Sequence, residues 1–384
     1  MKLRKIILAS AASTLLCGAH AESAAPAAPI DPVAGVISAL REHQIVAVGE
    51  VHAIEPMGRY WLRLLRDPGV TDLVDDVVLE AGNAVHQATV DRFTAGEDVP
   101  YAQLRRAWED SNPIGMFDLP MYEELYWAVR ARNKLHPDKR PMRVLLAGSP
   151  VDWSKVKSRA DLQAQQQAST APWRNDSPWI AKRIATEVLK RGRKALVLQG
   201  NMHTLKAKPA GAVESGDSWE MSILREEYGA SVFSVVVSLT DPRQFERAAG
   251  LVQLPAFIRL RGTPWGAVPV GQYIIGDPAA IHKTAKFNPA ILMAAQEQVD
   301  AVVFLALPAE LTSAVPSRGL CNDQEYIERR MSRLRISGDD KSTLPVTWRE
   351  LFEQRCERTL ICGADYAAPK LSPERSVNGR CGRD

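Results

Sequence analysis

The sequence predicts an α/β fold with a mainly parallel sheet and helices on both of its faces. Three observations carry this prediction. Short apolar runs such as 45–48, 195–198 and 301–307 have the composition of strands that are buried on both faces. Segments with the apolar spacing of helices alternate with these runs. Glycine and ionisable residues follow several of the runs directly, as they do where ligands bind at the carboxyl ends of parallel strands.

The first 21 residues are expected to be a signal peptide and not part of the fold. A basic start is followed by an apolar run over 6–16 and then by Ala19-His20-Ala21, the order of features in a secretory signal that is cleaved after Ala21. The run is too short to span a bilayer. Lipidation at Cys17 is the alternative, which we disfavour because the preceding Leu16 is not small. A periplasmic or secreted protein is therefore expected.

Charge and hydropathy argue against two classes of partner. The chain has 48 Lys and Arg residues against 45 Asp and Glu. Three of the basic residues lie in the signal segment, so the mature chain is near neutral and we expect no nucleic-acid binding. No later apolar run is long enough for a transmembrane helix. The expected partner is a small-molecule or peptide substrate, and the sequence carries no signal of oligomeric state.

Four cysteines gather in a C-terminal extension over 311–384, namely Cys321, Cys356, Cys362 and Cys381. In an oxidising compartment they predict two disulfides, with three possible connectivities. A zinc site is the alternative, but the four include no Cys-x-x-Cys pair and have no histidine among them. We therefore expect a disulfide-stapled tail.

The remaining elements follow in order along an α/β domain over 31–310, after a flexible Ala/Pro-rich lead-in over 22–30. Asp31-Pro32 predicts a helix start, with Asp31 as its N-cap. Apolar runs predict strands at 45–48, 77–79, 142–147, 195–198, 232–239 and 301–307. Helical spacing predicts helices at 31–42, 59–66, 85–93, 101–108, 121–133, 179–191, 218–228, 324–334 and 348–358. Segment 161–170 is a surface helix or mobile loop, and 251–276 is irregular or forms edge strands. The helices within 84–134 form an insert that we place over the strand ends.

Three of the strands end in side chains that can do chemistry. The first runs into Gly49-Glu50-Val51-His52, and the fourth runs into Gly200-Asn201-Met202-His203. The second stops at Glu80. If these strands are parallel neighbours, His52, Glu80 and His203 meet at one edge of the sheet.

Familiar catalytic and nucleotide-binding signatures are missing from the sequence, including Gly-x-Ser-x-Gly, His-Glu-x-x-His, the P-loop and Gly-x-Gly-x-x-Gly. Their absence disfavours a serine hydrolase or a dinucleotide enzyme.

This set of residues supports two kinds of chemistry. Glu50 or Glu80 can orient His52 as a general base toward water, with Arg59 or His203 stabilising an oxyanion. Alternatively, His52, Glu80 and His203 can bind a divalent metal such as zinc, manganese or cobalt and leave a position open for water. The sequence does not separate the two.

The same motifs resemble the superfamily that joins erythromycin esterases, ChaN-like haem-binding proteins and Tiki/TraB-type proteins. The resemblance extends over about 44–307 and is specific at Gly49–His52, Glu80 and Gly200–His203. It implies an α/β fold with its site at the strand ends. It also implies a general-base role for His52 if the chain is esterase-like, and a metal site at the paired histidines and glutamate if it is Tiki-like. Arg59 looks like the arginine that follows the first motif in the esterases. ChaN-like members bind haem instead, through a tyrosine that we do not assign to a position in this sequence.

Structural roles are the competing interpretation for several of these residues. Asp152, after the strand at 142–147, is more typical of an N-cap or turn. His86 lies on a predicted helix near Glu80, where a structural role is favoured. A salt bridge to Arg59 is the structural alternative for Glu80.

The function predicted from the sequence is an exported hydrolase that cleaves an ester or amide. In this hypothesis His52 is the base, Glu50 and Glu80 orient it or share a metal with it, and His203 and Arg59 stabilise charge. A non-enzymatic periplasmic protein that binds haem or a metal is the alternative from another class.

Overall fold

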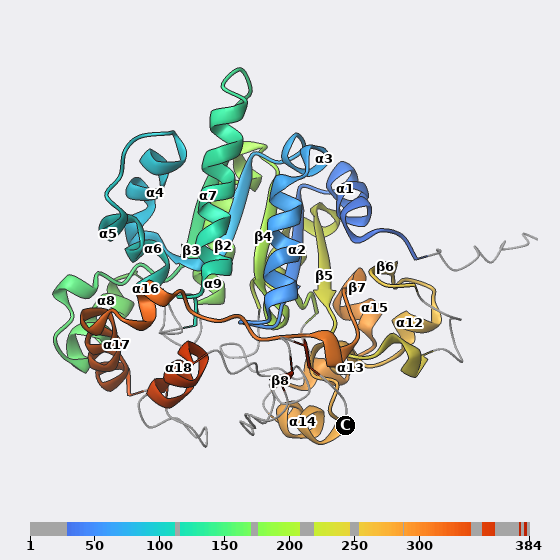
Figure 1. Cartoon of the computed structure of the whole chain (residues 1–384). Coiled ribbons are helices and arrows are strands. Elements are labelled where there is room, and N and C mark those ends of the chain that lie inside the picture. Colours follow the sequence, from blue (N-terminus) through green and yellow to red (C-terminus); the bar gives the residue numbers. More distant parts are fainter. Residues whose placement is uncertain are drawn as a thin grey trace, which may run out of the picture.

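A seven-stranded sheet in the order β3-β2-β4-β1-β5-β7-β6 forms the centre of the computed structural model (Figure 1). Every neighbouring pair is parallel except β6 and β7, which are antiparallel at one edge. The strands are β1 Ile45–Glu50, β2 Asp76–Asn83, β3 Arg143–Gly148, β4 Ala195–Gly200, β5 Val232–Val237, β6 Ala256–Arg259 and β7 Ala301–Phe304. The structure describes residues 29–111, 116–169, 176–207, 219–245, 253–286, 288–338, 348–357, 376–377 and 380–381. The predicted α/β fold with a mainly parallel sheet is confirmed.

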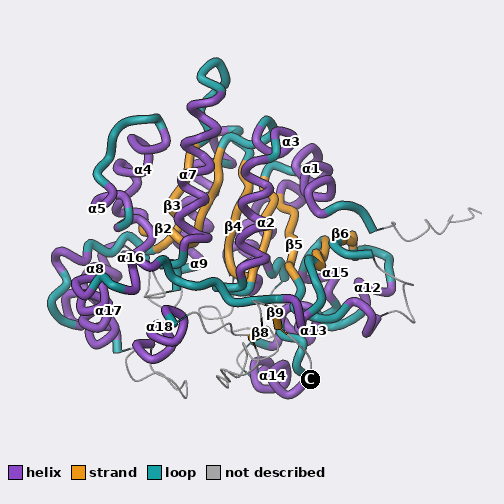
Figure 2. The backbone as a smooth tube through the Cα atoms, viewed as in Figure 1, coloured by secondary structure: helices purple, strands orange, loops and turns teal. Residues whose placement is uncertain are grey.

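Helices cover both faces of this sheet (Figure 2). Their bounds are α1 Pro32–Glu42, α2 Glu55–Arg66, α3 Pro68–Thr71, α4 Gln87–Thr94, α5 Tyr101–Leu104, α6 Arg106–Glu109, α7 Pro120–Leu135, α8 Arg159–Ser169, α9 Ser177–Glu187, α10 Glu220–Tyr228, α12 Pro264–Ala267, α13 Gly271–Ile274, α14 Pro278–Ala285, α15 Ala295–Gln298, α16 Arg318–Cys321, α17 Gln324–Ser337 and α18 Trp348–Cys356. Alternate strand residues face opposite sides, so Val46 and Val48 pack with α1, α2 and α7. Ile45 and Ala47 pack with α9 and α10.

The order of the strands brings three strand ends together. β4 lies between β1 and β2, with Glu50 opposite Gly200 and Leu79 opposite Leu198. After β1 the chain continues to α2 on one face, whereas after β4 it continues to α10 on the other. Open α/β sheets bind their ligands where neighbouring strands send their connections to opposite faces. The fold therefore places the two Gly-x-x-His motifs and Glu80 where a site is expected.

The predicted insert over 84–134 is helical, and its two parts lie at different places on the sheet. α7 runs along the face of the sheet beside α2 (Figure 1). The segment after α6 lies at the carboxyl end of β2, where the Asn83 side chain donates hydrogen bonds to the carbonyls of Asp110 and Val151. This second part of the insert therefore lies at the strand ends.

The C-terminal extension carries one described disulfide, between Cys321 and Cys356. The pairing joins α16 to the end of α18, as a stapled tail requires. Cys381 belongs to a two-residue strand, β9 Arg380–Cys381, which pairs with β8 Ser376–Val377. Cys362 lies outside the described residues, so a second disulfide stays a prediction.

Several element boundaries differ from those predicted. α2 begins at Glu55, four residues before the predicted start, and segment 161–170 belongs to a helix, α8. Segment 251–276 contains the antiparallel edge strand β6 and also two short helices, α12 and α13. The predicted signal peptide lies outside the described residues. Within the described part of the chain, no helix is long and apolar enough to cross a membrane.

Candidate active site at the strand ends

The two Gly-x-x-His motifs interlock, because each glycine leaves room for a residue of the other motif. A Cβ atom on Gly49 would lie 2.2 Å from the side-chain oxygen of Asn201. A Cβ atom on Gly200 would lie 3.0 Å from Nε2 of His52. The first separation leaves no room for a Cβ atom, so position 49 requires glycine, and the second is tighter than most Cβ contacts, so position 200 favours it. The repeated glycines therefore serve the close approach of β1 and β4 at their carboxyl ends.

Asn201 fixes the end of β4 to the neighbouring end of β5. Its side-chain amide donates to the carbonyl of Val237 at 2.8 Å, and its side-chain oxygen accepts from the Val237 N–H at 3.0 Å. Asn201 is buried, and the paired bonds satisfy both polar atoms of its amide. The loop that carries His203 thus leaves the sheet from a fixed point.

His52 is held by a buried carboxylate. Its Nδ1 lies 2.9 Å from Oε1 of Glu50, whose carboxylate can only accept, so Nδ1 carries the proton of this bond. Tyr122 on α7 donates to the same oxygen at 2.7 Å and accepts from the Ala53 N–H at 3.0 Å. Ala53 has a φ of 64°, a left-handed conformation that non-glycine residues adopt mainly where surrounding contacts impose it. These contacts leave Nε2 of His52 as the atom that faces the other motif.

His203 is held in the same way from the other side of the sheet. Its Nδ1 lies 2.9 Å from Oε2 of Glu220, the first residue of α10, whose carboxylate is fully buried. The ring also packs against Trp219 with ring centroids 4.8 Å apart. The hydrogen bond at Nδ1 fixes the tautomer and the orientation of the ring, and therefore the direction in which Nε2 points.

Glu80 lies between the two imidazoles. Its Oε1 is 3.7 Å from Nε2 of His52 and 3.4 Å from Nε2 of His203. Its other oxygen accepts from the Gly200 N–H at 2.6 Å. The structure therefore brings together His52, Glu80 and His203, three of the residues singled out in the sequence, and places Glu50 directly behind His52.

The charges of this cluster move the pKa values of its members in opposite directions. Burial alone lowers the pKa of His203, but the carboxylates of Glu220 and Glu80 raise it to about 10. The pKa of His52 is also raised, because Glu80 and Glu50 outweigh burial and the charge of His203. Burial raises the pKa of Glu80, yet the two imidazoles bring it below its usual value. At neutral pH, His203 is therefore a cation next to an ionised Glu80.

Two further carboxyl groups behave differently. Burial raises the pKa of Glu50, although His52 and Tyr122 oppose the shift. Burial likewise raises the pKa of Asp176 to about 6, with Glu220 and Glu80 adding to the effect and His203 opposing it. Such separated pKa values among neighbouring groups are typical of catalytic sites.

Three of the candidates are not brought to this cluster. The Arg59 side chain is 75% exposed and binds Glu55 on its own helix, so the predicted oxyanion role and the alternative salt bridge to Glu80 lack the necessary contact. His86 binds Asp110 at 2.9 Å, in line with the favoured structural role.

Asp152 caps a short 3₁₀ helix, η2 Trp153–Lys155, by accepting from the Ser154 N–H, and it also binds Lys155. This is the N-cap role that its sequence context indicated.

Sequence reasoning missed Tyr122, Glu220 and Asp176. The contact of Tyr122 with Glu50 joins residues 72 positions apart, and the contact of Glu220 with His203 joins residues 17 positions apart. No local pattern indicates such contacts. The one available signal was Glu220 at the start of a predicted helix that follows the second motif.

The donor atoms at this edge, two imidazole nitrogens and a carboxylate oxygen, are of the types that bind zinc. However, no group of three or more His, Cys, Asp or Glu residues in the described part of the chain is placed so that it could hold a metal ion. The predicted metal site therefore stays a prediction, and we derive no step through a metal.

No family model matches the chain, and no curated protein matches it. Among solved structures it is similar to a succinoglycan biosynthesis protein, with a TM-score of 0.49 and 11% identity over 73% of this chain and 94% of the other. It is similar to an erythromycin esterase mutant in its open conformation, with a TM-score of 0.44 and 12% identity over 71% and 92%. It is also similar to haem-bound ChaN of Campylobacter jejuni, with a TM-score of 0.32 and 15% identity over 53% and 84%.

Proposed function

We propose that the protein is a hydrolase that cleaves an ester or amide with His52 as general base. The observation that carries this proposal is the pair of fixed imidazoles, each with Nδ1 on a buried carboxylate and Nε2 facing Glu80. An imidazole whose second nitrogen is fixed by a carboxylate is the arrangement that serves proton transfer in hydrolases.

In the proposed reaction, Nε2 of neutral His52 takes a proton from water while the resulting hydroxide attacks the carbonyl carbon of the substrate. The oxygen of the tetrahedral intermediate gains a negative charge, which the His203 cation stabilises. When the intermediate collapses, the proton on His52 passes to the leaving alcohol or amine. Glu50 stabilises the imidazolium form of His52, and Glu220 and Glu80 together keep His203 protonated.

Hydrolysis of a panel of aryl esters and amides tests this proposal. We expect His52→Ala to lower kcat by about 10²- to 10⁴-fold, the usual contribution of a general base. His282→Ala removes an exposed imidazole on α14 and is the matched control, which we expect to keep full activity. Wild-type turnover that survives His52→Ala unchanged would contradict the proposal. No turnover together with a Soret band on haem titration would favour the non-enzymatic alternative.

We also propose that the protein acts outside the cytoplasm. The disulfide between Cys321 and Cys356 supports this, because stable disulfides belong mainly to oxidising compartments. The mass of the protein from its native host tests the proposal. Loss of residues 1–21 is the expected result, and an intact N-terminus in a cytoplasmic fraction would contradict it.

A further inference from the structure

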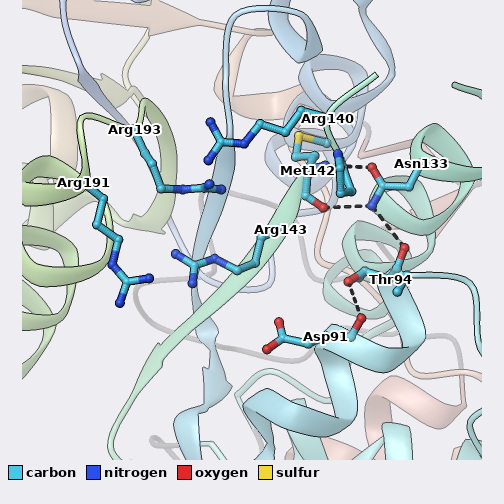
Figure 3. A pocket seen from close by; sticks show the side chains of 10 residues that line it. Asp91, Thr94, Asn133, Arg140, Met142, Arg143, Arg191 and Arg193 are labelled. Carbon is cyan, nitrogen blue, oxygen red and sulfur yellow. Dashed lines mark hydrogen bonds between the residues drawn. The ribbon is translucent and has the colours of Figure 1, made fainter. Parts of the chain in front are cut away.

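Four arginines line a second pocket at the end of the sheet opposite the candidate active site. Arg143 begins β3, and Arg193 lies just before β4. Arg191 ends the short helix η3 Leu189–Arg191, and Arg140 lies in the loop after α7. The pocket has a volume of about 490 Å³, within the size range of small-molecule sites. In Figure 3 the side chains of Arg140, Arg143 and Arg193 point toward one another from different segments.

A buried carboxylate fixes two of these guanidinium groups. Asp76, the first residue of β2, is fully buried and binds Nε of Arg143 at 2.9 Å and Nε of Arg193 at 2.6 Å. Arg193 adds a second bond from Nη2 to the other oxygen of Asp76, so its contact is bidentate. Both guanidinium groups are therefore held in place by the protein itself, and a ligand would not have to order them.

The other two arginines are more open. The side chains of Arg140 and Arg191 are 62% and 55% exposed. Each makes one described ion pair, to Asp75 at 2.9 Å and to Glu187 at 3.2 Å, respectively. A guanidinium has five N–H donors, so one carboxylate contact leaves donors for a further acceptor.

The residues at the floor of the pocket provide few acceptors for the guanidinium N–H groups. Met142 and Pro141 supply apolar surface. Asn133 uses its amide on the backbone of Met142, and the Thr94 hydroxyl lies within hydrogen-bond distance of the Asp91 carbonyl, as Figure 3 shows, and of the Val90 carbonyl, so both polar side chains are already satisfied.

We propose that this pocket binds an oxyanion, either phosphate or the phosphate of a phosphomonoester. Four guanidinium groups face four carboxylates, those of Asp75, Asp76, Glu187 and Asp91, so the pocket offers an oxyanion the guanidinium N–H donors that these carboxylates leave unused, and not a net positive charge. Planar guanidinium forks match the geometry of phosphate oxygens. Asp91 lines the pocket from α4, with one oxygen bonded to Gln87, and offers an acceptor for a hydroxyl group of the ligand. The site is independent of the proposed hydrolysis.

Isothermal titration at low ionic strength with inorganic phosphate and with glycerol phosphate tests the proposal. The informative variant is the double change Arg140→Gln/Arg191→Gln, which leaves Asp76 and its two arginines intact. Its matched control is Arg63→Gln, because Arg63 is 57% exposed and binds a single acid, Asp31, at 3.1 Å on another part of the surface. We expect the double variant to bind at least about tenfold more weakly, the effect of losing charged hydrogen bonds, and the control to bind like wild type.

Vesicles of phosphatidic acid, whose headgroup is a phosphomonoester, with phosphatidylcholine vesicles as the reference, distinguish the source of the phosphate. Saturable binding of glycerol phosphate that the double variant weakens supports a free ligand. Binding only to phosphatidic acid vesicles, again weakened by the double variant, supports a lipid headgroup. Absence of binding to every probe, or equal binding by wild type and the double variant, overturns the proposal.

Discussion

Single residues at the strand ends explain why the sequence repeats glycine before each histidine-bearing turn. Gly49 admits the Asn201 side chain, and Gly200 admits the ring of His52. The motif thus reflects contact between two strands as well as the chemistry of its histidines. Glycine, carboxylate and imidazole were all visible in the sequence, but their mutual contacts depend on which strands are neighbours.

Gly49→Ala tests the interlocked motifs. The added Cβ would lie 2.2 Å from the Asn201 oxygen, so the pair of bonds between Asn201 and Val237 has to break or shift. We expect a loss of about 1–3 kcal/mol in the free energy of unfolding, as for other overpacked sites. Urea denaturation measures this loss. Gly192→Ala is a useful comparison, because no atom lies within 4 Å of the corresponding Cβ position and only its positive φ of 63° opposes the change. A Gly49→Ala protein as stable as wild type would contradict the interlock.

The pH dependence of hydrolysis follows from the two imidazoles. The base must be neutral, and the pKa of His52 is raised, so kcat/KM should rise with pH through a value above the ordinary one for histidine. His203 must stay protonated, so the rate should fall as pH passes about 10. A pH profile of the wild-type enzyme checks both limbs. A rate that still rises well above pH 10 would contradict the proposal that His203 acts as a cation.

At the scale of elements, the strands could be predicted and most contacts of the C-terminal helices could not. Apolar runs located six of the seven strands of the main sheet, because a parallel sheet buried on both faces needs continuous apolar sequence. The packing of α17 on the insert gave no such signal. Arg330 of α17 is almost fully buried and binds Asp118 and the carbonyl of Glu109, more than 200 residues away. Polar pairs at such separations leave no periodic pattern in a sequence.

This buried ion pair lies next to the candidate active site, because Asp118 follows Phe117, whose ring packs edge-on against His52. Arg330→Met would leave the Asp118 carboxyl buried without its cation. We expect a loss of about 3–5 kcal/mol in unfolding free energy, the usual result of removing one partner of a buried pair.

The double variant Arg330→Met/Asp118→Leu serves as the control for this change. It removes both charges and should recover most of the lost stability, because an apolar pair can replace a buried ion pair. Thermal or urea unfolding of the two variants measures the difference. Equal stability of the single and double variants would contradict a coupled pair.

On the scale of the whole molecule, the C-terminal extension is tied to itself by the disulfide and to the insert by α17. The cysteine content predicted that the extension contains a disulfide, but it did not predict that Cys321 pairs with Cys356. Four cysteines allow three connectivities, and spacing alone does not choose among them.

Reduction tests the contribution of this cross-link to stability. Cys321 and Cys356 are 35 residues apart, and closing a loop of that length should contribute about 3–4 kcal/mol in the chain-entropy account. We expect dithiothreitol to lower the Tm of the wild-type protein. It should leave the Tm of Cys321→Ser/Cys356→Ser, already lowered, nearly unchanged. An equal drop in both proteins would locate the sensitive disulfide elsewhere.

His52 and His203 share Glu80 in one electrostatic unit, and NMR titration of the imidazole signals measures this coupling without any substrate. In the wild-type protein we predict that the His203 signal titrates at about pH 10 and the His52 signal above its ordinary range. In Glu80→Gln both transitions should move to lower pH, because the shared negative charge is gone. Two imidazoles that titrate at their ordinary pH and do not respond to Glu80→Gln would contradict the account.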